Sequence, residues 1–413
     1  MEKIEANTIR IVPTWARWMM PSISDVVFVF LFLRVLSLGS EILRDADIAW
    51  HIRTGDYILS TMAVPRTDIF SYRKYGQTWI AYEWFSDVIF AFVHRVAGLN
   101  GIVILSAFII ASTFFLLFKM LQARSFNLLV VTVVTLLAAV TSSIHWLARP
   151  HLFSMFLTAL WYFFLESHHR LPQRKYFLVF PVLMLLWVNL HPGYLLGLVL
   201  TGMYAIGNFG NYLMALGHGL QPGKRWIRSL VVIALFSFLA ALINPYGYGI
   251  LLFPFEVLGS SASMEAITEW GSPSFHHFSA YEFYLLLLVV TFFISSEKLD
   301  FVELGITLFA IHISLVSQRY IPIFAILMAP ILGQRLDAVC RTWLGQRSAF
   351  SVIRGAQNRI LESVARLEFL NAKLNHHTYG VALCLVMLFL AQNGGRAFGH
   401  TVLNYRVFSL SSG

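Results

Sequence analysis

Long, uninterrupted apolar runs recur along almost the whole chain. Candidate membrane spans lie at 24–40, 101–118, 127–144, 151–165, 176–190, 194–214, 229–243, 281–296, 301–317, 320–334 and 379–392, with a shorter run at 84–97. A transmembrane helix needs roughly 20 mostly apolar residues. The runs are continuous rather than alternating, which favours helices over a β-barrel. The sequence therefore predicts an all-α, polytopic transmembrane helix bundle of about 11–12 spans.

Composition supports this class. Of the 413 residues, 58% are hydrophobic and only 12% are charged, whereas soluble domains carry about a quarter charged residues. The net charge of +9 does not call for a nucleic-acid partner, because basic residues orient loops and contact anionic lipid headgroups. Cys340 lies in a basic segment and Cys384 in an apolar run, so no disulfide scaffold is expected.

Basic residues predict the orientation of the bundle. Lys3, Arg10 and Arg17 precede the first run, which lacks a small-residue cleavage site and is expected to be a retained anchor. Further basic clusters follow later spans: Lys119 and Arg124; Arg170, Arg174 and Lys175; Lys224, Arg225 and Arg228; Arg335, Arg341, Arg347, Arg354 and Arg359. We expect these clusters and the N-terminus on the cytoplasmic side, and the intervening loops outside.

This orientation divides the chain into four parts. Residues 1–23 form a cytoplasmic N-terminus, and residues 24–334 form the transmembrane module, whose long first outer loop is 41–83. Residues 335–378 form a cytoplasmic, basic, amphipathic segment in which apolar residues such as Val364 recur at helical spacing. Residues 379–413 are the final span and tail. A full span at 84–97 would invert every later helix and place the basic loops outside. We therefore expect an interfacial or re-entrant helix there; the alternative is that the positive-inside rule fails for this chain.

The first outer loop holds the densest group of ionisable residues. Asp45 and Asp47 precede a short amphipathic helix on which Asp47, His51 and Thr54 share one face. A carboxylate beside a histidine and arginines at a membrane surface is a candidate general base. The alternative is that either aspartate only caps the helix. Both interpretations stay open at this point.

Other polar strings occur at the predicted outer ends of spans. They read Arg149-Pro-His151, Asn189-Leu-His191, Asn244-Pro-Tyr-Gly, Glu269-Trp-Gly-Ser-Pro-Ser-Phe and Gln318-Arg319. Ionisable residues near a membrane are functional candidates, and arginine suits phosphate binding. The alternative is that these side chains reach toward lipid headgroups. Glu83, before the run at 84–97, is either a helix N-terminal charge or a site residue.

The first loop and the architecture resemble the GT-C superfamily of integral-membrane glycosyltransferases. Asp45-Ala-Asp47-Ile-Ala-Trp50-His51-Ile-Arg53 is similar to the acidic motif of the oligosaccharyltransferase catalytic subunit, in which an arginine lies six positions after an aspartate. The stretch from Asp45 to Pro65 also resembles the loop of bacterial enzymes that move sugars from lipid carriers, although Ala46 stands where those enzymes usually have glutamate. The later polar strings resemble a large bacterial family of polytopic membrane proteins without an assigned substrate.

The resemblance implies an inverting transfer of a sugar from a polyprenyl-phosphate-linked donor to a glycan, lipid or protein acceptor, at the outer face of the bacterial inner membrane. It implies Asp47, with Asp45 second, as the base. Substrate or phosphate contacts would come from Arg53, His51, Arg149, His151, His191, Arg319, Glu83 and Glu269. Some GT-C enzymes need a divalent metal, so Mg²⁺ or Mn²⁺ on Asp45 and Asp47 is an open alternative.

Two further functions stay in competition. Polysaccharide polymerases and ligases also place arginine and histidine residues around lipid-linked glycans at the outer face. A transporter or flippase of lipid-linked glycans would instead line a path with charged residues. Transporters typically show an internal repeat and helices broken at the membrane midplane. No repeat is visible in the sequence, and the polar strings lie at span ends, which favours an enzyme.

Overall fold

The structure is a computed structural model that describes residues 21–170, 176–217, 225–259, 268–345 and 351–373, together with 386, 396–397 and 400–401. Its helices are α3 (Ile23–Leu36), α4 (Asp47–Thr61), α5 (Trp84–Ala123), α6 (Leu128–Ser142), α7 (His151–Arg170), α8 (Tyr176–Leu190), α9 (Leu195–Gly217), α10 (Arg225–Ala241), α11 (Gly249–Gly259), α13 (Ala280–Ile294), α14 (Phe301–Val316), α15 (Ile321–Gly345) and α16 (Ser351–Lys373). Short 3₁₀ turns connect several of them: η1 (Gly39–Leu43), η2 (Ser143–His145), η3 (Pro192–Tyr194), η4 (Thr268–Trp270) and η5 (Gln318–Tyr320).

The prediction of an all-α bundle is confirmed in the described part of the chain. Extended structure is limited there to an isolated bridge between Thr67 and Thr78 and to the two-residue strands β1 (Arg396–Ala397) and β2 (His400–Thr401), which pair antiparallel. Each apolar run within the described residues forms a helix, whereas the run 379–392 lies outside them apart from residue 386. The helix α11 was not predicted.

Four helical segments of the described residues are long and apolar enough to cross a membrane: Trp84–Ala123, Leu128–His145, Pro192–Gly217 and Gln318–Leu344. The apolar helices Phe177–Leu190, Trp226–Ala241, Ala280–Ile294 and Phe301–Val316 are shorter. Large apolar side chains on the outer faces of these helices are exposed, including Phe293 at 85% and Ile206 at 75%. Water-soluble proteins rarely expose such extended apolar surface, so these faces suit contact with lipid.

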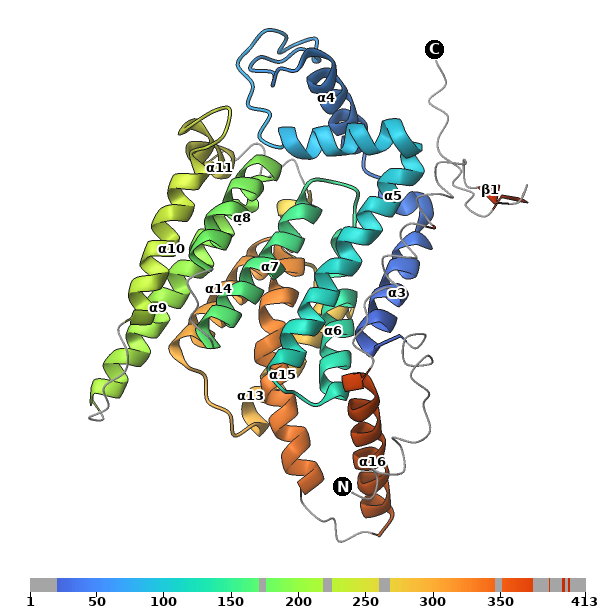
Figure 1. Cartoon of the computed structure of the whole chain (residues 1–413), viewed down its shortest axis with the longest axis vertical. Helices are drawn as coiled ribbons and strands as arrows, with labels where there is room; N and C mark the ends of the chain where they lie inside the picture. Colours follow the sequence, from blue (N-terminus) through green and yellow to red (C-terminus); the bar gives the residue numbers. More distant parts are fainter. Residues whose placement is uncertain are drawn as a thin grey trace.

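The core of the bundle is built around α5, α7 and α15. Residues 324–329 of α15 are fully buried, and Trp161 and Trp187 are buried between α7 and α8. At one end of the bundle α16 packs beside α3 and α6, where Glu368 accepts the Leu128 backbone N–H at 3.2 Å (Figure 1). The helix α15 continues through Arg335, a residue expected in a solvated basic segment. Arg335 is instead fully buried and pairs with Glu303 at 3.3 Å.

Gly98 divides α5 into two parts. Its φ of 60° and ψ of −157° are non-helical, a backbone conformation that is almost restricted to glycine. The first part of α5 lies across the end of the bundle and the second part descends through it (Figure 1). The run 84–97 is therefore not aligned with the other helices, as an interfacial helix requires.

Candidate functional site

The polar strings converge at the end of the bundle that α4 and the first part of α5 cover (Figure 1). These two helices pack closely because Gly55 has no side chain. A Cβ at position 55 would lie 1.9 Å from the backbone oxygen of Asp87. This close approach brings His51 on α4 within hydrogen-bond distance of Asp87 on α5. The packing thus joins the first loop to the bundle.

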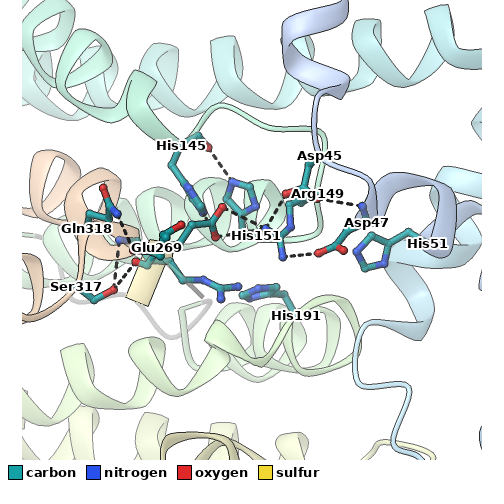
Figure 2. A network of polar contacts seen from close by, with 12 residues as sticks. Asp45, Asp47, His51, His145, Arg149, His151, His191, Glu269, Ser317 and Gln318 are labelled. Carbon is teal, nitrogen blue, oxygen red and sulfur yellow. Dashed lines mark hydrogen bonds and ion pairs between the residues drawn. The ribbon is translucent and has the colours of Figure 1, made fainter. Parts of the chain in front are cut away.

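Arg149 lies among three carboxylates from distant parts of the sequence (Figure 2). Its Nη1 is 2.9 Å from Asp45 Oδ2 and 3.3 Å from Glu269 Oε2, and its Nη2 is 2.7 Å from Asp47 Oδ2. The guanidinium is always charged in proteins. Arg149 therefore ties the start of α4 and the η4 turn to the start of α7.

Asp45 both caps the start of α4 and pairs with Arg149. Its Oδ1 accepts the Asp47 backbone N–H at 3.0 Å, at the start of α4, while its Oδ2 accepts from Arg149. Asp47 makes no such cap. Its side chain is 52% exposed and pairs with Arg149.

Glu269 and Arg319 are held by contacts between their two turns. Ser317 Oγ donates to the Glu269 carbonyl at 2.9 Å, and Gln318 donates to the Gly271 and Thr268 carbonyls at 3.0 and 2.8 Å. The Arg319 guanidinium lies 5.0 Å from the centre of the Trp270 ring, a cation–π arrangement. No carboxylate of the described residues forms an ion pair with Arg319 within 4.0 Å.

A second group of titratable side chains surrounds Glu83. His51 Nδ1 donates to Asp87 Oδ1 at 2.7 Å, and His51 Nε2 is 3.8 Å from Glu83 Oε2. On the other side His191 Nε2 is 3.4 Å from Glu83 Oε1. Glu83 begins α5, but its side chain makes no helix-capping hydrogen bond. It points to the two histidines instead.

Burial, the largest cause, and the nearby Asp87 carboxylate together raise the pKa of Glu83 to about 7, against the opposing charges of His51, Arg319 and Arg149. Burial would lower the pKa of His51, but the hydrogen bond to Asp87 and the charge of Glu83 outweigh it, so the net shift is upward. A carboxyl group that titrates near neutral pH can exchange a proton with a substrate. Glu83 therefore has the properties of a general base to a greater degree than the exposed, ion-paired Asp47.

The tautomer of His191 follows from its neighbours. The Gly193 backbone N–H can only donate, and it lies 3.0 Å from His191 Nδ1. Ser154 Oγ accepts from Trp187 Nε1 at 2.7 Å and is 2.8 Å from the same Nδ1. Nδ1 is thus an acceptor, and the proton of the neutral ring is on Nε2, toward Glu83. Burial and the charges of Arg319 and Arg149 lower the pKa of His191 well below its ordinary value, which keeps the ring neutral.

His145 and His151 form a further pair, with ring centres 4.2 Å apart. His151 Nε2 is 2.9 Å from the His145 carbonyl oxygen and donates to it, which leaves Nδ1 as an acceptor. His151 Nδ1, His145 Nε2 and His191 Nε2 are all buried without a hydrogen-bond partner. Buried polar atoms in this condition are uncommon and point to a binding role.

These histidines line a cavity of about 410 Å³. Arg319, Tyr82 and Trp270 line it as well, and the rest of its wall is mostly apolar, including Leu195, Leu196, Val199, Phe309 and Ile313. A concave apolar site with a few convergent polar groups is the usual form of a ligand site. The cavity and the group around Glu83 meet at Tyr82 and His191.

The Asn-Pro-Tyr-Gly string holds the first loop in place. Tyr246 Oη accepts from the Ala81 N–H at 2.8 Å and donates to the Pro65 carbonyl at 2.7 Å. Asn244 donates to Asn189 Oδ1 at 3.1 Å, and the Trp84 indole donates to the same oxygen at 2.9 Å. These residues position Glu83 from two directions.

The structure brings together nine of the ten sequence-predicted site residues. They are Asp45, Asp47, His51, Glu83, Arg149, His151, His191, Glu269 and Arg319. Arg53 is exposed on α4 and forms no ion pair with another described residue. Asp87 and Ser154 were not singled out from the sequence. The four-residue spacing of Glu83 and Asp87, which places both on one helix face, was the available signal for Asp87.

No set of three or more histidine, cysteine, aspartate or glutamate side chains in the described ranges is arranged to hold a metal ion. The carboxylates of Asp45 and Asp47 converge on Arg149 instead. A divalent ion on these aspartates stays a prediction.

No protein-family model matches the chain, and no curated protein is significantly similar to it.

Proposed function

We propose that the chain is a membrane glycosyltransferase that moves a sugar from a polyprenyl-phosphate-linked donor to a hydroxyl group of a glycan, lipid or protein acceptor. The observation that carries the proposal is the mostly apolar cavity. Its wall includes an arginine that has no ion-pair partner among the described residues, and a buried carboxyl group of raised pKa lies beside it. A lipid-linked donor needs an apolar path, a cation for its phosphate and a base for the acceptor.

Arg319 is the candidate for binding the phosphate. It lines the cavity, it has no ion-pair partner within the described ranges, and it lies over the Trp270 ring. Positive charge at this position stabilises the phosphate as the bond between sugar carbon and phosphate oxygen breaks.

Glu83 is the candidate general base. Its carboxylate accepts the proton of the acceptor hydroxyl as the new bond forms between the acceptor oxygen and the sugar carbon. His191 Nε2 and His51 Nε2 lie 3.4 and 3.8 Å from the two oxygens of this carboxylate. Asp47, the base that the GT-C resemblance implies, is the second candidate. Its carboxylate is already engaged in an ion pair with Arg149.

The proposal is tested with purified protein in proteoliposomes that contain a panel of radiolabelled polyprenyl-phosphate-linked sugars. We expect Glu83→Gln and Arg319→Gln each to slow transfer about 100-fold or more. Arg73→Gln is the matched control, because Arg73 lies exposed in the first loop. Asp47→Asn separates the two candidate bases.

Unchanged transfer in both the Glu83 and the Arg319 variants would contradict these roles. Movement of the intact lipid-linked sugar across the bilayer, without transfer to any acceptor, would instead support a flippase.

A further inference from the structure

The charged side chains around the cavity limit the charge that the donor can carry. Arg319 is the one lysine or arginine side chain among the residues that line the cavity. No aspartate or glutamate of the described residues lines it. The wall therefore offers a single positive charge to a ligand.

Arg149, the other arginine of the site, is already neutralised. Three carboxylates contact its guanidinium, so the group of Arg149, Asp45, Asp47 and Glu269 carries an excess of negative charge. A ligand with several negative charges would be repelled by this group and could not recruit Arg149 without breaking its ion pairs. Arg149 is partly buried, and a ligand that recruits it has to replace these charge-assisted contacts.

The histidines on the wall add hydrogen bonds but no charge at neutral pH. The Gly193 N–H fixes His191 Nδ1 as an acceptor, so the neutral ring has a single N–H. His151 likewise uses its Nε2–H for the His145 carbonyl. Placing a second anionic phosphate in this mostly apolar cavity would leave a charge without a partner, which is costly.

We propose that the lipid-linked donor carries one phosphate, joined to the sugar as a phosphodiester with a single negative charge, and not a diphosphate. This inference rests on the proposed function. The apolar wall formed by Leu195, Leu196 and Val199 of α9 and by Phe309 and Ile313 of α14 receives the isoprene units next to the phosphate. Arg319 forms the single ion pair with the phosphodiester.

The first test compares the binding of four probes to the purified protein in detergent: methyl farnesyl phosphate, farnesyl diphosphate, farnesol and inorganic phosphate. We expect the phosphodiester to bind roughly tenfold or more tightly than each of the other three. Arg319→Gln should remove the advantage of the phosphodiester over farnesol, whereas Arg73→Gln should keep it.

The second test changes the charge available to the ligand. The double variant Asp45→Asn, Asp47→Asn releases Arg149 from two of its three carboxylates. We expect its affinity for farnesyl diphosphate to rise relative to that for methyl farnesyl phosphate, because a second guanidinium becomes available. If the aspartates have only a structural role, the double substitution should weaken the binding of both ligands to the same degree. The melting temperature of the double variant shows whether it is folded. If it is not folded, the same comparison of affinities is made with the single variant Asp45→Asn.

The outcomes separate the inference from the function on which it rests. If wild-type protein binds farnesyl diphosphate as tightly as the phosphodiester or more so, the single-phosphate inference is overturned, while the polyprenyl-linked donor stands. If neither prenyl ligand binds better than farnesol or inorganic phosphate, the proposed function fails as well.

Discussion

Glu83 is a carboxyl group held between two histidines, with a second carboxylate nearby and little access to water. His51 and His191 approach its two oxygens at 3.8 and 3.4 Å. Burial is the largest cause of its raised pKa, because a charged carboxylate loses its hydration there. A group of this kind changes its protonation state near neutral pH, and two predictions follow from it.

The first prediction concerns the pH dependence of transfer. A general base acts in its ionised form, so activity should fall as the pH decreases through about 7, the pKa of Glu83. Glu83→Asp should retain part of the activity with an altered pH profile, whereas Glu83→Gln should be inactive throughout. The measurement is the transfer rate between about pH 5 and pH 9. A wild-type profile that is flat across this range would exclude Glu83 as the base.

The second prediction concerns stability. The folded protein holds the Glu83 proton with a pKa of about 7, whereas the ordinary value is 4.5. The contribution of Glu83 to stability is therefore fully present below about pH 4.5 and is lost as the pH rises through about 7. The loss is on the order of 3 kcal/mol.

Glutamine cannot ionise and escapes this loss. We expect Glu83→Gln to melt at a higher temperature than the wild type at about pH 8, with the difference shrinking toward about pH 5. Thermal melting of the purified wild type and variant in detergent, at about pH 5 and about pH 8, measures this difference. A variant that is less stable than the wild type at every pH would mean that Glu83 is needed for packing rather than for chemistry.

At the scale of elements, the kink in α5 places the site over the bundle. The part before Gly98 carries Asp87 and begins beside Glu83, while the part after it belongs to the core. The first part packs against α4 through Gly55. The Asn189, Asn244 and Tyr246 contacts hold its beginning. A straight helix through position 98 would separate these contacts.

Gly98→Ala tests this role of the kink. The φ of 60° disfavours any residue with a Cβ, at a cost of about 1–3 kcal/mol. We expect a lower melting temperature and reduced transfer. A Cβ at position 98 meets no atom within 4 Å, so strain is the only expected cause.

Gly202→Ala is the matched control. A Cβ at position 202 also meets nothing within 4 Å, and Gly202 lies within α9 without a positive φ. Alanine favours helices over glycine by about 1 kcal/mol, so this variant should melt at or above the wild-type temperature. Equal effects of both substitutions would show that the backbone at Gly98 is not strained.

At the scale of the whole molecule, the site gathers at one end of the bundle, while Arg124, Arg335 and Arg341 lie toward the other. The distribution of basic residues predicts that the site faces outward. Cysteine labelling tests this prediction in a background in which both native cysteines are replaced by serine. Ser274 precedes α13 and Ser296 follows it, and both are exposed.

We expect a membrane-impermeant maleimide to label Ser274→Cys in cells whose inner membrane is intact. Ser296→Cys should be labelled only after that membrane is permeabilised. The reverse pattern would place the site on the cytoplasmic face and would exclude an outer-face acceptor.

The apolar runs by themselves determined most of the long helices, though not α11, since the length and continuity of an apolar run are local properties of the chain. The same runs placed Arg149, His191 and Arg319 at helix ends, because ionisable groups are costly within an apolar span. The sequence also identified the acidic pair at 45 and 47, without separating a base from a cap.

Only the tertiary structure decided how these groups act. Arg149 pairs with carboxylates about 100 residues away on either side, and no spacing rule reaches that far. The raised pKa of Glu83 arises because α4, α5 and the end of α8 bury it together, and burial depends on the whole packing. For the same reason Asp87 and Ser154 could be recognised as site residues only from the tertiary structure, which places them beside His51 and His191.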